Sequence, residues 1–512
     1  MVSIAIGVLL TPIILGTLGS QLFGIWALLN TVTAYESISD LGIPTAMVWF
    51  VNKSRSNETK NQLITAGVLA NTATTLVAVL LLVVLRDPII RLLFKVPVDL
   101  LPATELAYTL TLVAMVLMVL ARSFSAVLDA FQRVDLRFAV DTVGTLAWAG
   151  ILWIFLRRGF GLGGVVGATV IVGGLRALAM AISMLRVYPP FRLRLRLARS
   201  TLSGIVHYGI RVQGASLGQS LSDPLLKGLT GVGLTAVEVG AVQVGASAAS
   251  VPNSLAFSMI GYLFPAIAER HGAGDLAGVR KMASHNLLYV VIFVLPVSVF
   301  LLCSAPVLVR LWLHDSYPLI VASLRLLTFA YVFRALGMVP WYVSWGLGHP
   351  QDNSVAMIAQ VSLLAGGGAA LLLLSRFSYT GILAVYIGSM AASTVYLTWC
   401  MARRLPGFFS VDNPWLFGSV LRVLLISLLA SVPYLLIGRT GIASSWTLLL
   451  ADAAILVLSY AAAFALAIPE AERDTLKQLL QRPVRRLQHL TGIGRTVAED
   501  TTVSSDEHLE ET

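Results

Sequence analysis

The 512-residue chain is 57% hydrophobic and only 12% charged, and its mean hydropathy is +0.83. Soluble domains are about a quarter charged, so this composition excludes an ordinary soluble protein. Long apolar segments recur along nearly the whole length, which indicates an all-α integral membrane protein with many spans. The net charge of +10 does not indicate nucleic-acid binding, because the basic residues cluster at helix ends, as membrane orientation requires.

The residues that usually hold metals are scattered. Cys303 and Cys400 both fall in apolar spans, where they fit small buried side chains and not a disulfide framework. The seven histidines show no metal-binding spacing. We therefore expect no metal and no cofactor.

The hydropathy pattern predicts fourteen transmembrane helices. A bilayer core is roughly 30 Å thick, so about 20 helical residues span it. The predicted spans are 2–17, 22–51, 62–85, 106–128, 138–156, 163–185, 204–226, 234–266, 286–309, 321–346, 354–375, 380–401, 418–437 and 445–468. The second, at about thirty residues, suits a tilted or locally broken helix. Lys and Arg are more than twice as frequent on one side of these spans, which places both termini in the cytoplasm.

Polar residues form a stripe on the second span. Asn30, Thr33, Ser37 and Asp40 recur at spacings that place them on one helical face, with Glu36 close beside it. An ionised aspartate facing lipid would cost several kcal/mol, so this face should contact protein or water. Two interpretations stay open: the stripe holds neighbouring helices together, or it lines a substrate path.

The chain repeats itself at an offset of roughly 218 residues. The segment 89–112 resembles 308–331, and 156–174 resembles 374–390. A second polar stripe runs along the eighth span, through Gln243, Ser247, Ser250, Ser254 and Ser258. The repeat predicts two six-helix lobes related by an axis along the membrane normal, followed by two extra helices.

These observations divide the chain into five parts. We expect a first lobe at 1–187, a cytoplasmic linker at 188–203, a second lobe at 204–403 and the two extra helices at 404–468. In the linker, arginine alternates with leucine, which suits a membrane surface. Residues 469–512 form a basic amphipathic segment and an acidic tail.

Two motifs typical of enzymes occur in unsuitable places. The Gly-x-Ser-x-Gly pattern at Gly214–Gly218 needs a strand–turn–helix elbow, but it lies in the middle of an apolar span. There its small residues favour close helix packing. The Gly-x-Gly-x-x-Gly pattern at Gly159–Gly164 lies in a helix connection without a preceding strand. Neither motif indicates catalysis.

The seventh span is the most polar. His207, Arg211, Gln219 and Asp223 lie on much of one side of it. A buried arginine is a candidate for anion binding, because its planar fork suits phosphate. The alternative is that Arg211 forms a purely structural pair with an aspartate, either Asp40 or Asp223.

Other charged residues lie within or close to spans. Arg122 and Arg334 occupy loosely comparable places in the two repeats and are further candidates for the cavity. For Arg422 and Asp452, in the two extra helices, we expect a structural ion pair.

The sequence also resembles a known family. LGSQLFGIWALL followed by SDLGIPTAMVWFV resembles the first two helices of bacterial polysaccharide flippases, which belong to the MATE-like (MOP) superfamily. The segment VGAVQVGASAASVPNSLAFSMIGYLFPAIAERHGAGD is similar to the family's eighth helix. The resemblance covers roughly residues 1–470, and against it the first span is short by about half a helix, so a start upstream is one expectation.

The resemblance implies a function. Such flippases move an isoprenoid-pyrophosphate-linked oligosaccharide across the bacterial inner membrane by alternating access, for polysaccharide or cell-envelope biosynthesis. The expected partners are this lipid-linked oligosaccharide, the lipid bilayer, polysaccharide-assembly proteins and a coupling ion, H⁺ or Na⁺, but no nucleic acid. The cavity candidates are Arg211, Asp40, Arg122, Arg334, Asp223, Gln219, His207, Asn30, Ser37 and Gln243.

Two other functions compete with this one. A MATE-type cation-coupled multidrug antiporter would share the scaffold and would use an acidic residue, often in the first helix. Residues 2–17 contain none, but Glu36 and Asp40 leave the antiporter open. A membrane glycosyltransferase or polymerase would need catalytic residues on a substantial outer loop, and the longest outer segment is the short stretch 86–105.

Overall fold

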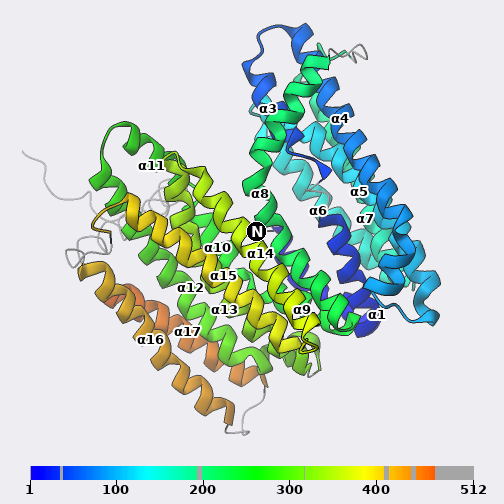
Figure 1. Cartoon of the computed structure of the whole chain (residues 1–512). Coiled ribbons are helices and arrows are strands. Elements are labelled where there is room, and N and C mark those ends of the chain that lie inside the picture. The colour runs from blue at the N-terminus through cyan, green and yellow to red at the C-terminus, as the bar shows by residue number, and fades with distance from the viewer. Residues whose placement is uncertain are drawn as a thin grey trace, which may run out of the picture.

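A computed structural model describes residues 2–34, 39–192, 199–315, 317–408, 414–439 and 445–467, and within these ranges the chain is helical without a strand (Figure 1). The longer α-helices are α1 (Val2–Ala34), α4 (Asn57–Val84), α5 (Leu101–Ala130), α6 (Val134–Arg157), α7 (Gly161–Val187), α8 (Arg199–Gly233), α12 (Leu276–Leu313), α13 (Pro318–Gly346), α14 (Pro350–Leu373), α15 (Tyr379–Arg404), α16 (Pro414–Arg439) and α17 (Ser445–Ala467). The shorter ones are α3 (Ile43–Lys53), α9 (Ala236–Ala249), α10 (Val251–Ile260), α11 (Leu263–Gly272), a π-helical turn η1 (Pro88–Leu93) and a 3₁₀ turn η2 (Val98–Leu100).

Local sequence signals explain many of the helix starts. A proline lies in the first turn of α3, α5, α10, α13 and α14, where its missing N–H costs nothing. The α9 helix starts with a capping box between Thr235 and Glu238. The Asp275 carboxylate caps α12 by accepting a hydrogen bond from the Gly278 N–H at 2.7 Å.

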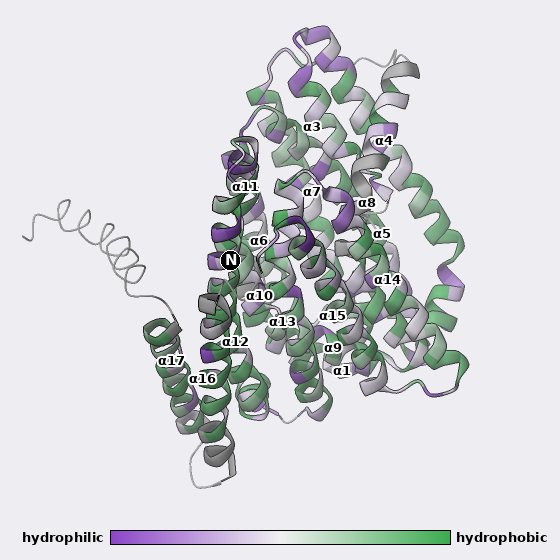
Figure 2. Ribbon diagram, turned by 60° about the vertical axis from the view of Figure 1, so that its left-hand side comes forward, coloured by the Kyte–Doolittle hydropathy of each residue, from purple (hydrophilic) through white to green (hydrophobic). Residues whose placement is uncertain are grey.

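Ten helices of the described ranges are long and apolar enough to cross a membrane, and Ala236–Ala249 and Gly418–Val432 are shorter apolar helices. This confirms an all-α protein with many spans. Figure 2 shows the hydrophobic residues along the helices, with hydrophilic ones gathered at the tip of α3 and α4 and along α11.

The second and eighth predicted spans are not continuous helices. The α1 helix continues through the expected first turn with a bend at Gly19, whose φ is 72°. Asp40, Leu41 and Gly42 then form a turn before α3, with φ values of 46° and 69° at Leu41 and Gly42. Asp40 therefore lies in a turn and not on the helical face that the sequence predicted. The eighth span is divided into α9, α10 and α11, because Pro252 starts a new helix.

The helices form two groups, which are joined at one end (Figure 1). Helices α1 and α3–α7 form one group, and α9–α15 form a second group that α16 and α17 cover at α12. We call the two ends of the molecule the Gly19 end and the Lys53 end, after the bend in α1 and the last residue of α3. One apolar core at the Gly19 end includes residues of both groups, whereas at the Lys53 end each group has a core of its own.

Two glycines bring the groups into close contact near the Gly19 end. A Cβ on Gly24 of α1 would overlap the Ala236 carbonyl of α9, and one on Gly240 would lie 3.2 Å from the Gly24 Cα. Small residues allow helix backbones to approach in this way within a membrane. The contact closes the molecule at the Gly19 end.

The α8 helix links the two groups. Its beginning packs on α3 and α4, and its later part packs on α14. At Gly209 a Cβ would lie 3.0 Å from the Gly42 carbonyl carbon, so α8 lies directly against the Asp40–Gly42 turn. The seventh predicted span therefore contributes side chains to both groups.

We predict that Gly24→Ala destabilises the protein by about 1–3 kcal/mol, because the added methyl group overpacks the α1–α9 contact. Gly16→Ala is the matched control: it lies on the same helix, and a Cβ there meets nothing within 4 Å. Thermal unfolding in detergent measures both. Equal melting temperatures for the two variants would contradict the close contact.

Candidate functional site

A pocket of about 830 Å³ opens at the Lys53 end of the first group. We call it the cationic pocket; it is lined by Pro44, Thr45, Val48, Trp49, Asn52, Lys53, Arg122, Ser125, Ala126, Asp129, Arg137 and Tyr208. The Lys53 ammonium lies 4.8 Å from the centre of the Trp49 ring, and this ring stacks on Tyr208 of α8 at 4.9 Å. Three basic side chains thus surround one open space, with a single carboxylate, Asp129, among the described lining residues.

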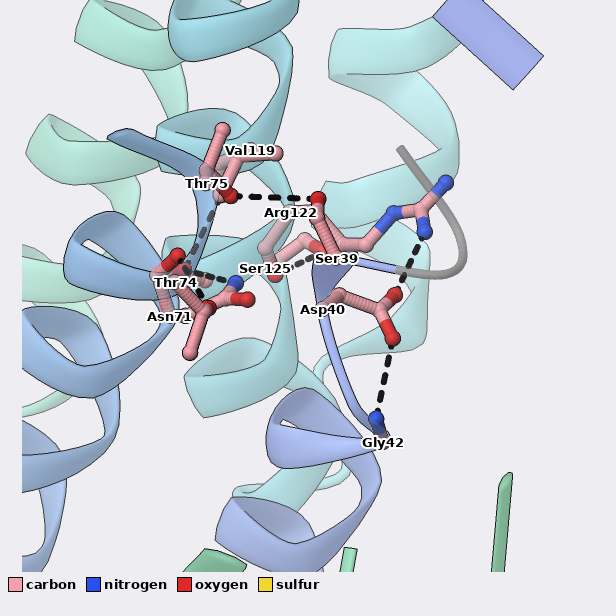
Figure 3. Close-up of polar contacts among 10 residues, drawn as sticks. Ser39, Asp40, Gly42, Asn71, Thr74, Thr75, Val119, Arg122 and Ser125 are labelled. Atoms are coloured by element: carbon pink, nitrogen blue, oxygen red, sulfur yellow. Dashed lines mark hydrogen bonds and ion pairs between the residues drawn. The ribbon is translucent and has the colours of Figure 1, made fainter. Parts of the chain in front are cut away.

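The Asp40 carboxylate anchors one of these cations. It receives hydrogen bonds from Arg122 Nη1 at 2.8 Å and from the Gly42 N–H at 2.9 Å (Figure 3). The second bond closes a tight turn of the kind that aspartate favours, and the start of α3 adds favourable dipoles for a negative charge. The Asp40 side chain is 8% exposed and that of Arg122 is 45% exposed. The pair therefore presents its positive member to the pocket.

A second pocket, of about 410 Å³, opens at the same end and is lined mostly by residues of the second group. We call it the aromatic pocket, because Phe257, Trp341, Tyr342 and Trp345 line it together with Arg334, Asn353, Gln360, Ser393 and Thr394, among others. Thr45 of α3 lines both pockets, so they adjoin at this residue.

Arg334 is also paired with an aspartate. Its Nη1 lies 3.4 Å from Asp223 Oδ2 of α8, and the Tyr386 hydroxyl donates to the other carboxylate oxygen. Here the exposures are reversed: the arginine side chain is 22% exposed and the aspartate 36%. The aromatic pocket is therefore closer to neutral than the cationic pocket.

The comparisons with known proteins identify the family. A family model described as polysaccharide biosynthesis protein matches residues 17–322, which is more than half of the chain. The chain belongs to this family. No match to a curated protein is significant.

Solved structures show the fold. The lipid II flippase MurJ in an inward closed conformation is 11% identical, with a TM-score of 0.71 over 90% of this chain and 96% of that one. An inward-facing multidrug resistance MATE transporter is 15% identical, with a TM-score of 0.59 over 80% and 94% of the two chains. A point mutant of the Vibrio cholerae MATE transporter VcmN is 17% identical, with a TM-score of 0.53 over 80% and 96%. This member of the polysaccharide biosynthesis family is therefore a multi-pass membrane protein with a fold like those of MurJ and the MATE transporters.

The structure pairs four of the predicted site residues, Asp40 with Arg122 and Asp223 with Arg334. Asp40 and Asp223, which the sequence suggested as alternative partners of Arg211, are thus each paired with another arginine. Arg211 and Gln219 are on α8, but their side chains lie outside the described parts, and so does Ser37 altogether. His207 on α8 is exposed, while Asn30 on α1 and Gln243 on α9 are half-buried. None of these last three is among the described residues that line the two pockets.

Several lining residues were not singled out by the sequence. Trp341 and Trp345 are spaced by four residues on α13, and Asn353 and Gln360 by seven on α14, so each pair shares a helical face. This spacing was the signal in the sequence that could have indicated the pocket. In an apolar span, however, an aromatic pair is equally typical of a packed core or a lipid-facing surface.

The structure also bears on the Gly214–Gly218 motif and on the expected Arg422–Asp452 pair. The Gly214–Gly218 motif lies within α8, and a Cβ on Gly218 would overlap Met357 of α14, as expected for close packing. The expected pair of Arg422 with Asp452 is replaced by other contacts. Arg422 donates to the Leu466 carbonyl at 3.0 Å, and Asp452 accepts from the Ser304 hydroxyl at 2.6 Å. The antiparallel α16 and α17 place these two charges at different heights.

We predict that Arg122→Gln lowers the stability of the protein by roughly 1–3 kcal/mol, because the buried Asp40 carboxylate loses a charged hydrogen-bond donor. Adding Asp40→Asn should recover most of this loss, because an amide is less costly to leave in the same place. Denaturation in detergent measures both variants.

The control for this prediction is Arg133→Gln. Arg133 also forms an ion pair, with Asp135 at 3.0 Å, but both side chains are exposed. Its removal should change stability by less than about 1 kcal/mol. If Arg122→Gln and Arg133→Gln behaved alike, Asp40–Arg122 would not be a stabilising pair.

Proposed function

We propose that the protein translocates an isoprenoid-pyrophosphate-linked oligosaccharide from the inner to the outer leaflet of the bacterial inner membrane, for polysaccharide or cell-envelope biosynthesis. The observation that carries the proposal is the cationic pocket, in a member of the polysaccharide biosynthesis family. A pyrophosphate crossing a membrane needs such positive groups, because the bilayer itself offers no counter-charge.

The charges of the pocket suit this cargo. Lys53, Arg122 and Arg137 line the open space. Arg122 is paired with Asp40 and Arg137 with Asp129, each at 2.8 Å. The three lining cations therefore outnumber the two carboxylates that are paired with them, which leaves Lys53 for an anionic ligand. Guanidinium groups bind phosphate oxygens in pairs, and an ammonium adds a point charge.

The proposed topology follows from the distribution of Lys and Arg, with the Lys53 end and both termini in the cytoplasm. The two groups of helices would be six-helix lobes at 1–187 and 204–403, joined by the linker 188–203. Two further spans at 404–468 and a cytoplasmic tail at 469–512 complete the proposed fourteen. The pockets then open to the cytoplasm, and the Gly24–Gly240 contact closes the outer side.

Transport would proceed by alternating access. One lobe would rock against the other, closing the Lys53 end and opening the Gly19 end around the pyrophosphate and glycan while the lipid tail stays in the bilayer. A coupling ion, H⁺ or Na⁺, and polysaccharide-assembly proteins are the further partners of this proposal. Arg211, Gln219, His207, Asn30, Ser37 and Gln243 stay candidates for other parts of the path.

The multidrug antiporter is the competing function. An antiporter needs a carboxylate that exchanges a cation for its cargo. Asp40 and Asp223, the described candidates, each bind an arginine side chain. Bound in this way, both carboxylates act as counter-ions of the protein's own cations, which favours the flippase.

We predict that Lys53→Gln reduces translocation roughly tenfold or more, the effect expected when one charged contact to a phosphate is lost. Lys60→Gln is the matched control, because Lys60 also lies over an aromatic ring, that of Phe131 at 5.3 Å, but does not line the pocket. The measurement follows polyprenyl-pyrophosphate-linked glycan in a depleted host that expresses either variant at the same level.

The three outcomes of this experiment differ clearly. Accumulation of the glycan in the inner leaflet with Lys53→Gln, but not with Lys60→Gln, supports the proposal. Full rescue by both variants would remove the cationic pocket from the mechanism. If depletion produced no accumulation and raised drug sensitivity instead, the antiporter would be the correct function.

A further inference from the structure

We propose that the aromatic pocket is a sugar-binding subsite, which holds the glycan of the cargo while the cationic pocket holds its pyrophosphate. This inference rests on the proposed function and assigns a different part of the cargo to each of the two pockets. It is drawn from the side chains that line the aromatic pocket.

The two pockets are placed to hold neighbouring parts of one molecule. Thr45 lines both, so the two pockets adjoin at this residue. The volume of the aromatic pocket, about 410 Å³, is in the range of small-ligand sites. A glycan is bonded directly to the pyrophosphate, so the two must occupy adjacent sites.

The aromatic walls suit the C–H faces of sugar rings. Trp341 and Trp345 lie one turn apart on α13, with ring centres 6.5 Å apart and planes at 79°. Two nearly perpendicular flat surfaces can contact two differently oriented rings. Indole and phenol side chains also combine an apolar face with a polar edge, which matches a sugar better than a purely aliphatic wall does.

Fixed amides supply the polar part of the pocket. The Asn353 Nδ2 donates to the Trp341 carbonyl at 3.1 Å, and the Gln360 Nε2 donates to the Ser222 hydroxyl at 2.8 Å. Asn353 is 1% exposed, and its Oδ1 has no hydrogen-bond partner among the described residues. A buried acceptor without a donor favours a ligand that brings one, and a sugar hydroxyl does so.

The charge of the pocket disfavours the other parts of the cargo. Arg334 is the one residue with a formal charge among the described lining residues, and it is bound to Asp223 and mostly buried. A pyrophosphate would therefore prefer the cationic pocket. A prenyl chain would leave the Asn353 oxygen unpaired and gain nothing from the amides.

The test measures binding of two probes to the full-length protein in nanodiscs of phosphatidylethanolamine and phosphatidylglycerol, by equilibrium dialysis. One probe is farnesyl pyrophosphate, which has no sugar. The other is the oligosaccharide that mild acid releases from the host's polyprenyl-linked pool, which has no pyrophosphate. The variants are Trp341→Leu in the aromatic pocket, Lys53→Gln in the cationic pocket, and Trp399→Leu as a control on an exposed tryptophan that lines neither.

We expect opposite effects of the two pocket variants. Trp341→Leu should weaken binding of the oligosaccharide roughly tenfold, as is typical of a tryptophan at the centre of a contact. It should change the affinity for farnesyl pyrophosphate by less than about twofold. Lys53→Gln should do the reverse, and Trp399→Leu should change neither probe. If Trp341→Leu does not fold, Trp345→Leu replaces it, because this ring is more exposed, at 44%.

The outcomes that overturn the inference are distinct from failure of the proposed function. If Trp341→Leu weakened binding of farnesyl pyrophosphate and left binding of the oligosaccharide unchanged, the aromatic pocket would hold the prenyl chain. If the wild type bound farnesyl pyrophosphate but not the oligosaccharide, the sugar subsite would be wrong and the proposed function would stand. If it bound neither probe, the proposed function itself would fail.

Discussion

A charge within the apolar part of a membrane protein needs a counter-charge, hydrogen bonds or contact with water. Two of the arginine–aspartate pairs among the described residues meet this need beside the candidate site. Breaking a buried ion pair leaves an uncompensated charge, so such pairs constrain the helices that carry them. Asp40–Arg122 joins the turn before α3 to α5, and Asp223–Arg334 joins α8 to α13. Each pair lies beside a pocket, and together they fix the walls of the candidate site.

The arrangement of the apolar cores explains why these pockets open at one end. At the Gly19 end, Leu28, Val239 and Leu324 belong to one core that includes both groups of helices. At the Lys53 end the cores are separate, so less apolar burial holds the groups together there. Polar and charged side chains can line the resulting space because water reaches it. A change of state would exchange the two ends and would have to separate Gly24 from Gly240.

The sequence predicts the helices better than it predicts their breaks. Apolar runs of sufficient length give the existence and approximate limits of the long helices, because a bilayer requires both. The prediction of a polar stripe through Asn30 and Asp40, however, assumed that the helix is continuous between them. The chain instead turns at Asp40–Gly42, with Leu41 in a left-handed conformation that a leucine seldom adopts. Tertiary contacts with α8 at Gly209 support this turn, and no local pattern encodes them.

The candidate site was predictable in its chemistry but not in its pairing. Charged residues are rare in the spans, so Arg122, Arg334, Asp40 and Asp223 stood out in the sequence, whereas their partners depend on how distant helices pack. The aromatic pocket was less visible, since tryptophans in apolar segments are common for several reasons. What separates Trp341 and Trp345 from ordinary lipid-facing residues is that they line the same pocket as the amides of α14.

The two pairs also separate structural groups from those that can meet a ligand. The Asp40 carboxylate is buried and holds a turn, so its role is to position Arg122. The half-exposed guanidinium, with Lys53 and Arg137, then faces the pocket. In the second pair the arginine is the more buried member, and Asp223 largely neutralises its positive charge. The same two residue types thus produce one pocket with excess positive charge and one close to neutral, which is the difference that a cargo made of pyrophosphate and sugar requires.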